Sequence, residues 1–402
     1  MAFQQGLSGL NAASRNLDVI GHNIANANTV GMKSSRAEFA ELYASSVGAS
    51  GGISQGIGVS IATVSQAFTQ GNLTITGRDM DVAINGNGFF AMSMPDGSLQ
   101  YSRDGQFKLD RDGRILNNQG GQLMGYPTDV DGNRTAFDPI ALSLPTGGPI
   151  PANETKTITA EFNLDARATG AEPAGTYGTT VLVYDQQGKA IPVAMAFEKQ
   201  ANNQWQITAT MTDEAGVVQP LGNFNIAFNP DGSFDEANSD PVEFDVLSLN
   251  AANGADFPVT VNLENITQFA SPFSVTNLTQ DGYPPGELTS LQIEDNGVIM
   301  ARYSNGESQA AGQIQLVNFR NAQGLAPVGG NGWVATFASG APIPGAPGEG
   351  NMGMLKAGAV EDSNVDLTAE LVNMMTAQRA YQANAQTIKT QDQIMSTLLN
   401  MR

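Results

Sequence analysis

The sequence predicts a mostly β protein with an α-helix at each end. All 19 prolines of the 402 residues lie between Pro95 and Pro347, so only the two ends are free of this helix-breaking residue. Both ends carry apolar residues in alternating steps of four and three, as in helices that pack against helices. Short β-branched and aromatic runs separated by turns fill the interior. We therefore predict that the N- and C-terminal helices form a coiled-coil-like core domain, joined to two β domains, the second inserted in the first.

The first predicted element is a helix over residues 1–30. Its small or apolar positions form a heptad seam: Phe3, Leu7, Leu10, Ser14, Leu17, Gly21 and Ile24. Gly6, Gly9 and Gly21 each weaken an isolated helix by about 1 kcal/mol relative to Ala, so we expect packing to order it. A connector is expected over residues 31–71, and its glycine-rich stretch 48–60 is interpreted as flexible, because it lacks the Lys-Ser/Thr ending of a phosphate-binding loop.

The middle of the chain is assigned to two β domains. The first is expected over 72–144 and again over 285–345, with a linker over 346–363. Asp-Gly and Asn-Gly pairs predict hairpin turns; they begin at Asp96, Asp104, Asp112, Asp231, Asn296 and Asn305. Pro- and Gly-rich stretches bracket residues 145–284, which is expected of a domain inserted through two neighbouring linkers.

The last predicted element is a helix over residues 364–402. Asn364 or Asp366 is suited to cap it, and Glu370 lies where a carboxylate favours the helix dipole. The heptad positions are Leu367, Leu371, Met374, Gln378, Tyr381, Ala385, Ile388, Asp392, Met395 and Leu399. We expect the two terminal helices to pair antiparallel with each other and to pack against neighbouring subunits. The apolar members of both seams, from Phe3 to Leu399, are the candidate subunit-interface residues.

Composition argues against an enzyme. The chain has no Cys, and its one histidine is His22, so thiol chemistry and a Ser-His-Asp triad outside that position are excluded. Acidic loops such as 129–132 lack the spacing of a calcium loop and are better explained as turns. No catalytic, metal or cofactor site is predicted.

Charge is unevenly distributed along the chain. The net charge is −20, which argues against nucleic acid or an anionic membrane as partner. Residues 145–284 hold 4 basic and 17 acidic residues, a balance of −13, whereas residues 1–71 hold 3 of each. We therefore expect the inserted domain to face water and the neutral ends to pack against copies of themselves.

At the two ends of the chain lie SGLNAASRNLDVIGHNIANANTVGMK (8–33) and SNVDLTAELVNMMTAQRAY (363–381), and both stretches resemble the flagellar rod, hook and hook-junction proteins. Residues 8–33 match the amino-terminal pattern of that family through Leu10, Asn11, Asn23, Ile24, Ala25, Asn26, Thr29, Gly31 and Lys33. Residues 363–402 match the carboxyl-terminal pattern, including Ser363, Asn364, Asp366, Gln378, Arg379 and Asn384. His22 and Met32 depart from it, where Asn and an aromatic residue are usual. The stretches 76–90, 101–127 and 280–325 are similar to the β domain of hook-type subunits, and the block 145–284 makes the chain longer than a distal-rod subunit.

The resemblance implies a structural subunit that assembles into a curved hollow tube and transmits motor torque as a flexible joint. It implies helices lining the tube, contacts with itself, the distal rod protein, the hook cap, the hook-filament junction protein and the type III export apparatus, and an extracellular location. No cleaved signal peptide or membrane span is recognisable in the sequence. The alternatives are a distal-rod or other axial subunit, a secreted adhesin binding through residues 145–284, and an extracellular enzyme, which composition opposes.

Overall fold

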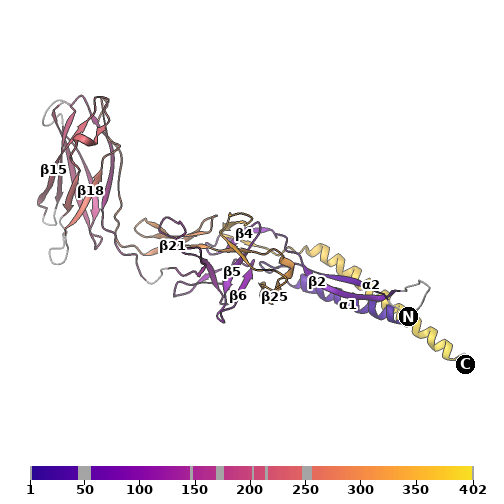
Figure 1. Cartoon of the computed structure of the whole chain (residues 1–402). Coiled ribbons are helices and arrows are strands. Elements are labelled where there is room, and N and C mark those ends of the chain that lie inside the picture. Colours follow the sequence, from indigo (N-terminus) through magenta and orange to yellow (C-terminus); the bar gives the residue numbers. More distant parts are fainter. Residues whose placement is uncertain are drawn as a thin grey trace. The chain divides into compact units, whose positions relative to one another are not determined.

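The computed structural model describes residues 2–43, 56–144, 148–168, 176–201, 203–212, 216–246 and 256–400. It divides into two compact units (Figure 1). The first unit comprises Met1–Gly147, Leu291–Ala301 and Gln309–Arg402, and the second comprises Gly148–Ser290 and Arg302–Ser308. Strands predominate and the two α-helices lie at the two ends of the chain, which confirms the predicted fold class.

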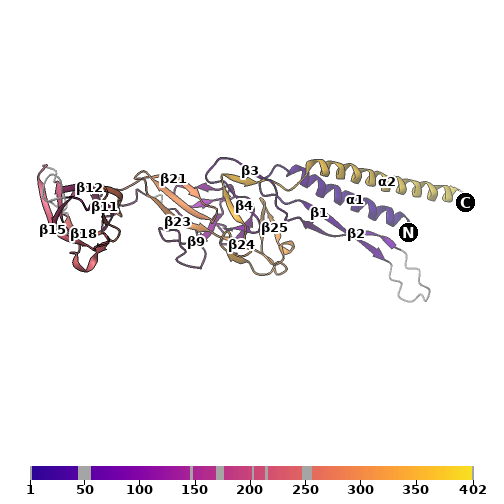
Figure 2. The same cartoon turned by 90° about the horizontal axis from the view of Figure 1, so that it is seen from above.

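The terminal helices and one β-hairpin form the end of the first unit that carries both termini (Figure 2). α1 (Ala2–Ala25) and α2 (Leu367–Asn400) lie antiparallel, and the strands β1 (Ser35–Tyr43) and β2 (Gly56–Gln66) pair antiparallel beside them. The interpretation of residues 48–60 as a flexible connector is wrong for 56–60, which belong to β2. Valine and isoleucine alternate with small polar residues in GIGVSIATVSQ, and this pattern favours a strand despite the glycines. Residues 48–55 lie outside the described residues.

The rest of the first unit is β structure. The largest sheet, of which all but the start of β21, the end of β22 and the first residue of β23 belongs to this unit, runs in the order β21-β22-β23-β9-β5-β6-β26-β25, with short strands attached at its edges. The strands of this sheet are β5 (Phe89–Ser93), β6 (Leu99–Ser102), β7 (Lys108–Leu109), β8 (Ile115–Leu116), β9 (Gln122–Tyr126), β10 (Ile140–Ala141), β21 (Leu288–Ile293), β22 (Val298–Tyr303), β23 (Ser308–Ile314), β24 (Leu316–Asn318), β25 (Ala326–Gly329), β26 (Gly332–Val334) and β27 (Ile343–Gly345). A 3-10 turn, η2 (Ala322–Gly324), precedes β25.

Two short antiparallel pairs bring the chain leading into α2 back beside the chain that follows β2. They are β29 (Ala359–Glu361) with β3 (Leu73–Ile75), and β28 (Met354–Ala357) with β4 (Val82–Asn85). Val82, Ile84 and Leu355 are buried in these pairs and belong to one core cluster with Phe90 and Leu316. A second cluster is aromatic and includes Phe89, Tyr101, Phe319 and Trp333, with Phe68 packed against it. These two clusters hold both chain ends to one β domain.

Most of the predicted hairpin turns are confirmed. The glycines after Asp96, Asp112, Asp231, Asn296 and Asn305 all have positive φ values, as such turns require. The prediction at Asp104-Gly105 is wrong. A Cβ at Gly105 would lie 1.7 Å from the carbonyl oxygen of Val82, so this glycine allows a close approach to β4 instead of forming a hairpin.

The second unit contains two five-stranded sheets that share one core. The first sheet comprises β11 (Thr157–Asp165), β17 (Glu243–Val246), β18 (Phe257–Asn262), β19 (Thr267–Phe269) and β20 (Ser274–Gln280). The second comprises β12 (Thr176–Tyr184), β13 (Ala190–Ala201), β14 (Gln204–Thr212), β15 (Val218–Phe228) and β16 (Phe234–Asp235), followed by a 3-10 turn, η1 (Glu236–Asn238). Alternate residues are buried along β14 and β18, as expected of strands with one face on a core.

The chain enters and leaves the second unit along neighbouring segments. Ile150 pairs with Gly286 and Asn153 pairs with Tyr283 through isolated β-bridges. The Ile150 N–H donates to the Gly286 carbonyl at 2.8 Å, and the Asn153 N–H donates to the Tyr283 carbonyl at 3.0 Å. Two adjacent strands of chain are the topology of a domain inserted into another.

Candidate assembly interface

α1 and α2 pack through small residues. A Cβ at Gly6 would lie 3.1 Å from Ile388 Cγ1, and one at Gly9 would lie 2.9 Å from Asn384 Nδ2. Ala13, Ile20 and Asn23 continue the buried side of α1. The glycines that weaken an isolated α1 therefore allow close approach to α2 in the folded chain, as small residues do between helices.

The predicted interface residues of α1 lie beside this contact. Leu7 is 45% exposed, whereas Leu10, Leu17 and Ile24 are half-buried. The heptad seam expected from sequence therefore lies on a different side of α1 from the seam that meets α2. The observed seam runs through Gly6, Ala13 and Ile20. Phe3 lies on α1, but its side chain is outside the described residues.

The predicted interface residues of α2 are still more exposed. Leu367, Leu371, Tyr381 and Met395 are among the exposed large apolar side chains, and Leu371 and Met395 are 51% and 58% exposed. Met374 and Ile388 are half-buried, and the side chain of Leu399 is outside the described residues. Val372 and Met375, which sequence reasoning did not select, add to the exposed apolar surface near the start of α2. Such a row of apolar side chains on a helix is typical of a surface that packs against another protein.

α2 is longer than the helix it pairs with. Ile388 already lies opposite Gly6, near the start of α1, and α2 continues to Asn400. Residues 392–397 are all exposed. The last turns of α2 therefore present Ile394 and Met395 without a partner helix among the described residues.

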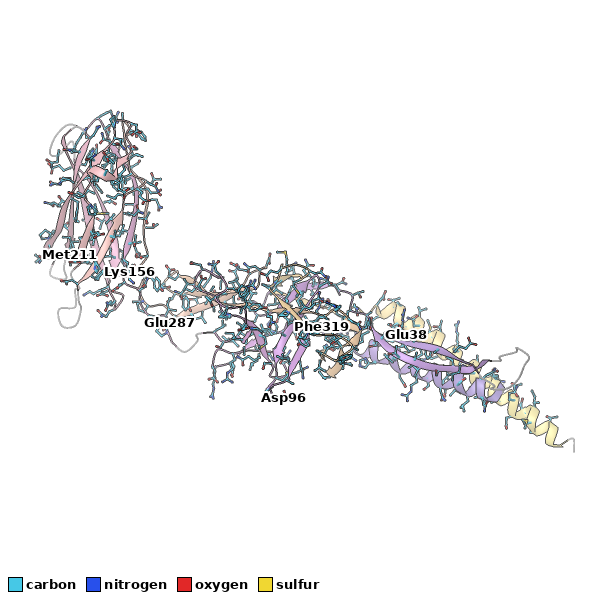
Figure 3. All side chains as sticks on the ribbon, in the orientation of Figure 1. Glu38, Asp96, Lys156, Met211, Glu287 and Phe319 are labelled. Carbon is cyan, nitrogen blue, oxygen red and sulfur yellow. The ribbon has the colours of Figure 1, made fainter. Side chains whose placement is uncertain are left out.

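The amino-terminal hairpin is held against the base of the helices by Asn23. The buried Asn23 side chain donates to the Ser35 carbonyl at 2.8 Å, accepts from the Ser35 N–H at 2.9 Å, and donates to Glu370 Oε1 at 3.2 Å. This one motif residue thus joins α1, β1 and α2. Glu38 lies on the hairpin, as Figure 3 shows.

A buried ion cluster of Lys33, Arg103 and Glu361 ties the helices to the β domain. Glu361 is 0% exposed; its Oε1 accepts from Lys33 Nζ at 2.5 Å and its Oε2 accepts from Arg103 Nη1 at 2.9 Å. The Gly71 N–H also donates to Glu361 Oε1, at 2.9 Å. Burial lowers the pKa of the Lys33 ammonium, and the Glu361 carboxylate opposes that shift.

Neighbouring motif residues complete this junction. Gly31 has φ +72°, and its N–H donates to the Glu361 carbonyl at 2.8 Å; a Cβ there would lie 2.6 Å from the backbone nitrogen of Asp104. Asn364 accepts from the Ser34 N–H at 2.7 Å and donates to the Ala67 carbonyl at 2.7 Å. Only glycine suits the position at residue 31.

The remaining motif residues have local or exposed positions. Asp366, and not Asn364, caps α2, because its Oδ1 accepts from the Thr368 and Ala369 N–H groups. Asn26 and Thr29 bond to backbone carbonyls in the turn after α1, and Ser363 accepts from the Val365 N–H. Asn11, Gln378 and Arg379 are exposed and are not brought together with the junction.

Sequence reasoning selected Lys33 but missed both of its charged neighbours. Arg103 lies in a stretch that resembles the family, whereas Glu361 lies in the predicted linker 346–363. The available sign for Glu361 was a charged residue next to an apolar pair, in AVE (359–361). Among the described residues no group of three or more metal-binding side chains gathers in one place. Within those same ranges, neither helix has the length and apolar character needed to cross a membrane.

Four family descriptions match successive parts of the chain. "Flagella basal body rod protein" matches residues 3–33 and "Flagellar hook protein FlgE/F/G D1 domain" matches 83–163. "Flagellar basal body protein FlaE D2 domain" matches 152–283 and "Flagellar basal body rod FlgEFG protein C-terminal" matches 356–401.

Full-length relatives carry one common description. The chain is 42% identical to the flagellar hook protein FlgE of Salmonella typhimurium, over 100% of both chains. It is 33% identical to the flagellar hook protein FlgE of Borreliella burgdorferi, over 100% of this chain and 99% of that one. Among solved structures, Helicobacter pylori flagellar hook protein FlgE2 has a similar fold, with a TM-score of 0.57 at 14% identity over 70% of this chain and 99% of that one.

Proposed function

This chain belongs to the flagellar hook protein family, and we propose that it builds the hook by self-assembly into a curved hollow tube that acts as a flexible joint. It is a structural subunit of the flagellar hook. We also propose that this subunit has no catalytic activity. The observation that supports assembly most directly is the row of exposed apolar side chains on α2, which a single copy leaves in water.

In this proposal the terminal helices form the inner wall of the tube. Leu7, Leu367, Leu371, Tyr381 and Met395 meet neighbouring copies, while the small-residue seam between α1 and α2 stays within each copy. The neutral balance of residues 1–71 favours such close packing of like chains, and the acidic block 145–284 suits an outer, water-facing position.

The proposed partners at the ends of the tube are the distal rod protein, the hook cap and the hook-filament junction protein. The chain is proposed to reach its extracellular position through the flagellar type III export apparatus, without a cleaved signal peptide. The family resemblance at both ends of the chain supports these partners.

The first test is electron microscopy of the purified protein, concentrated in a salting-out buffer with short hook fragments as seeds. We expect curved or readily bent tubes. Straight rods would instead indicate a rod-type subunit. Persistent monomers despite seeding would contradict assembly and favour the alternative of a secreted adhesin.

A truncation tests the role of the helices. Removal of residues 363–402 retains Glu361 and both β units but removes all of α2. We expect a folded protein that does not polymerise, because the exposed apolar row is gone. Circular dichroism would check the fold and sedimentation would check assembly; tubes of normal yield from this variant would overturn the proposed role of α2.

A further inference from the structure

The segment from residue 321 to residue 348 contains no Asp, Glu, Lys or Arg. Across the whole chain, 58 of the 402 residues are charged (19 basic and 39 acidic). The segment covers η2, β25, β26 and β27 of the first unit. It also carries three exposed large apolar side chains, Val328, Phe337 and Ile343. An uncharged surface with exposed apolar groups is typical of a protein–protein contact.

Phe337 is fully exposed, yet the loop that carries it is held firmly. Thr336 Oγ1 donates to the Gly324 carbonyl at 2.6 Å, which fixes the loop to η2. The buried Ser339 side chain donates to the Thr336 carbonyl at 2.8 Å and accepts from the Thr336 N–H at 3.0 Å. The Asn321 side chain donates to the Ala338 carbonyl at 3.0 Å. An aromatic side chain on such a pinned loop loses little conformational entropy on binding.

The same unit contains an apolar groove of a size to receive an aromatic ring. Its volume is 410 Å³, and its apolar lining is Val19, Val64, Phe68, Leu325 and Pro327. Asp18, His22, Ser35, Gln66 and Gln323 supply its polar lining. Since Phe337 is fully exposed, it does not occupy this groove in its own chain.

We propose that Phe337 of one copy inserts into this apolar groove of a second copy of the same chain. The inference rests on the proposed polymerisation and identifies one contact within it. A second copy is favoured because copies with a net charge of −20 repel each other, so stable contacts need uncharged surfaces on both sides. The loop carries no charged side chain and the groove only that of Asp18, and a loop of one copy in a groove of the next is a contact that extends a polymer.

The first experiment compares Phe337→Ala with Phe137→Ala. Phe137 is 83% exposed in the same unit but lies beside charged groups, with Arg134 Cζ 5.8 Å from its ring centre, and is the matched control. We expect Phe337→Ala to raise the critical concentration for seeded tube growth at least tenfold, while Phe137→Ala leaves it unchanged. An unchanged critical concentration for Phe337→Ala would overturn the proposal.

The second experiment uses the absence of cysteine in the natural sequence. Two single-cysteine variants, Phe337→Cys and Val64→Cys, are mixed, assembled on seeds and oxidised. Because each chain holds one cysteine, a Phe337→Cys chain linked to a Val64→Cys chain reports only a contact between copies. We expect this mixed disulfide dimer as the main product within tubes and its absence from unassembled chains.

The possible results distinguish the groove contact from the proposed function. Tubes without the mixed dimer, or with disulfide dimers mainly between two Phe337→Cys chains, would overturn the groove contact and leave the proposed function intact. Failure of the unmodified chain to form tubes would remove the proposed function and this contact together.

Discussion

One carboxylate, that of Glu361, accepts hydrogen bonds from three separate segments of the chain, through Lys33, Gly71 and Arg103. The sequence contained Lys33 within a recognisable motif, but nothing in local pattern indicated that residues 33, 103 and 361 would meet. Their contact depends on the pairing of β29 with β3 and on the turn at Gly31, which are tertiary features. Local propensity therefore could not predict the buried ion cluster.

The substitution Glu361→Gln should strongly destabilise the first unit. It leaves two buried cations without a counter-ion, a loss that costs about 3–5 kcal/mol when a buried pair is broken. We expect the thermal transition of the first unit to fall while that of the second unit stays in place, measured by calorimetry. Glu38→Gln is the control, because its partner Arg36 is 80% exposed and solvent screens such a pair, so its loss changes stability little. Equal effects of the two substitutions would contradict this account.

The Glu361→Gln chain should regain part of its lost stability as pH rises. Without the Glu361 carboxylate, burial and Arg103 lower the pKa of Lys33 further. The unfolded chain then binds more protons than the folded chain, up to the ordinary lysine value of 10.5, so the free energy of unfolding rises with pH in that range. Denaturant unfolding of Glu361→Gln at pH 7 and pH 9.5 should show part of the loss recovered; a flat profile would contradict a buried, charged Lys33.

At the scale of elements, heptad spacing predicted both helices and their antiparallel pairing but not which side of each helix meets the other. The large apolar residues were expected on the seam, whereas Gly6, Gly9 and Ala13 occupy it. Spacing alone cannot distinguish a close contact between small residues from an apolar row kept for another chain. The hairpin β1–β2 was missed because glycines obscured the alternation in β2.

Substitutions on α2 should separate folding from assembly. Leu371→Ser and Met395→Ser change exposed side chains, so we expect monomer stability within about 0.5 kcal/mol of the natural chain. Seeded growth should need at least tenfold more protein, because each removes apolar surface proposed to meet a neighbouring copy. Ala380→Ser, also exposed on α2, is the control. Sedimentation of assembled material measures all three, and normal growth of both test variants would exclude this surface from assembly.

At the scale of the whole molecule, the acidic block and its flanking linkers predicted a separate unit inserted into the β domain. The strands of this unit could be predicted from alternating apolar and polar residues, as in QWQITATM. The sequence pattern did not indicate that Arg302–Ser308, which covers the end of β22 and the turn into β23, belongs to the second unit.

Deletion of residues 151–285, with a short Gly-Ser linker in their place, should spare tube formation and change curvature. The ends to be joined lie together, since the Ile150 N–H bonds to the Gly286 carbonyl. The deletion removes 17 acidic and 4 basic residues, and so 13 of the 20 net negative charges, and leaves the helices and their exposed apolar residues. Electron microscopy would measure yield and curvature, and complete loss of tubes would mean that the second unit contributes essential contacts between copies.

The buried ion cluster also has a consequence for the order of folding. Lys33 and Glu361 are 328 positions apart, so their bond closes one of the longest loops in the chain. In a chain that emerges amino end first, Lys33 and Arg103 stay solvated until nearly all of the sequence has followed. We expect the cluster to form after the rate-limiting step, so Glu361→Gln should refold at the natural rate and unfold faster, as stopped-flow measurements would test. Closure of this bond would then mark the moment at which a newly arrived subunit is complete.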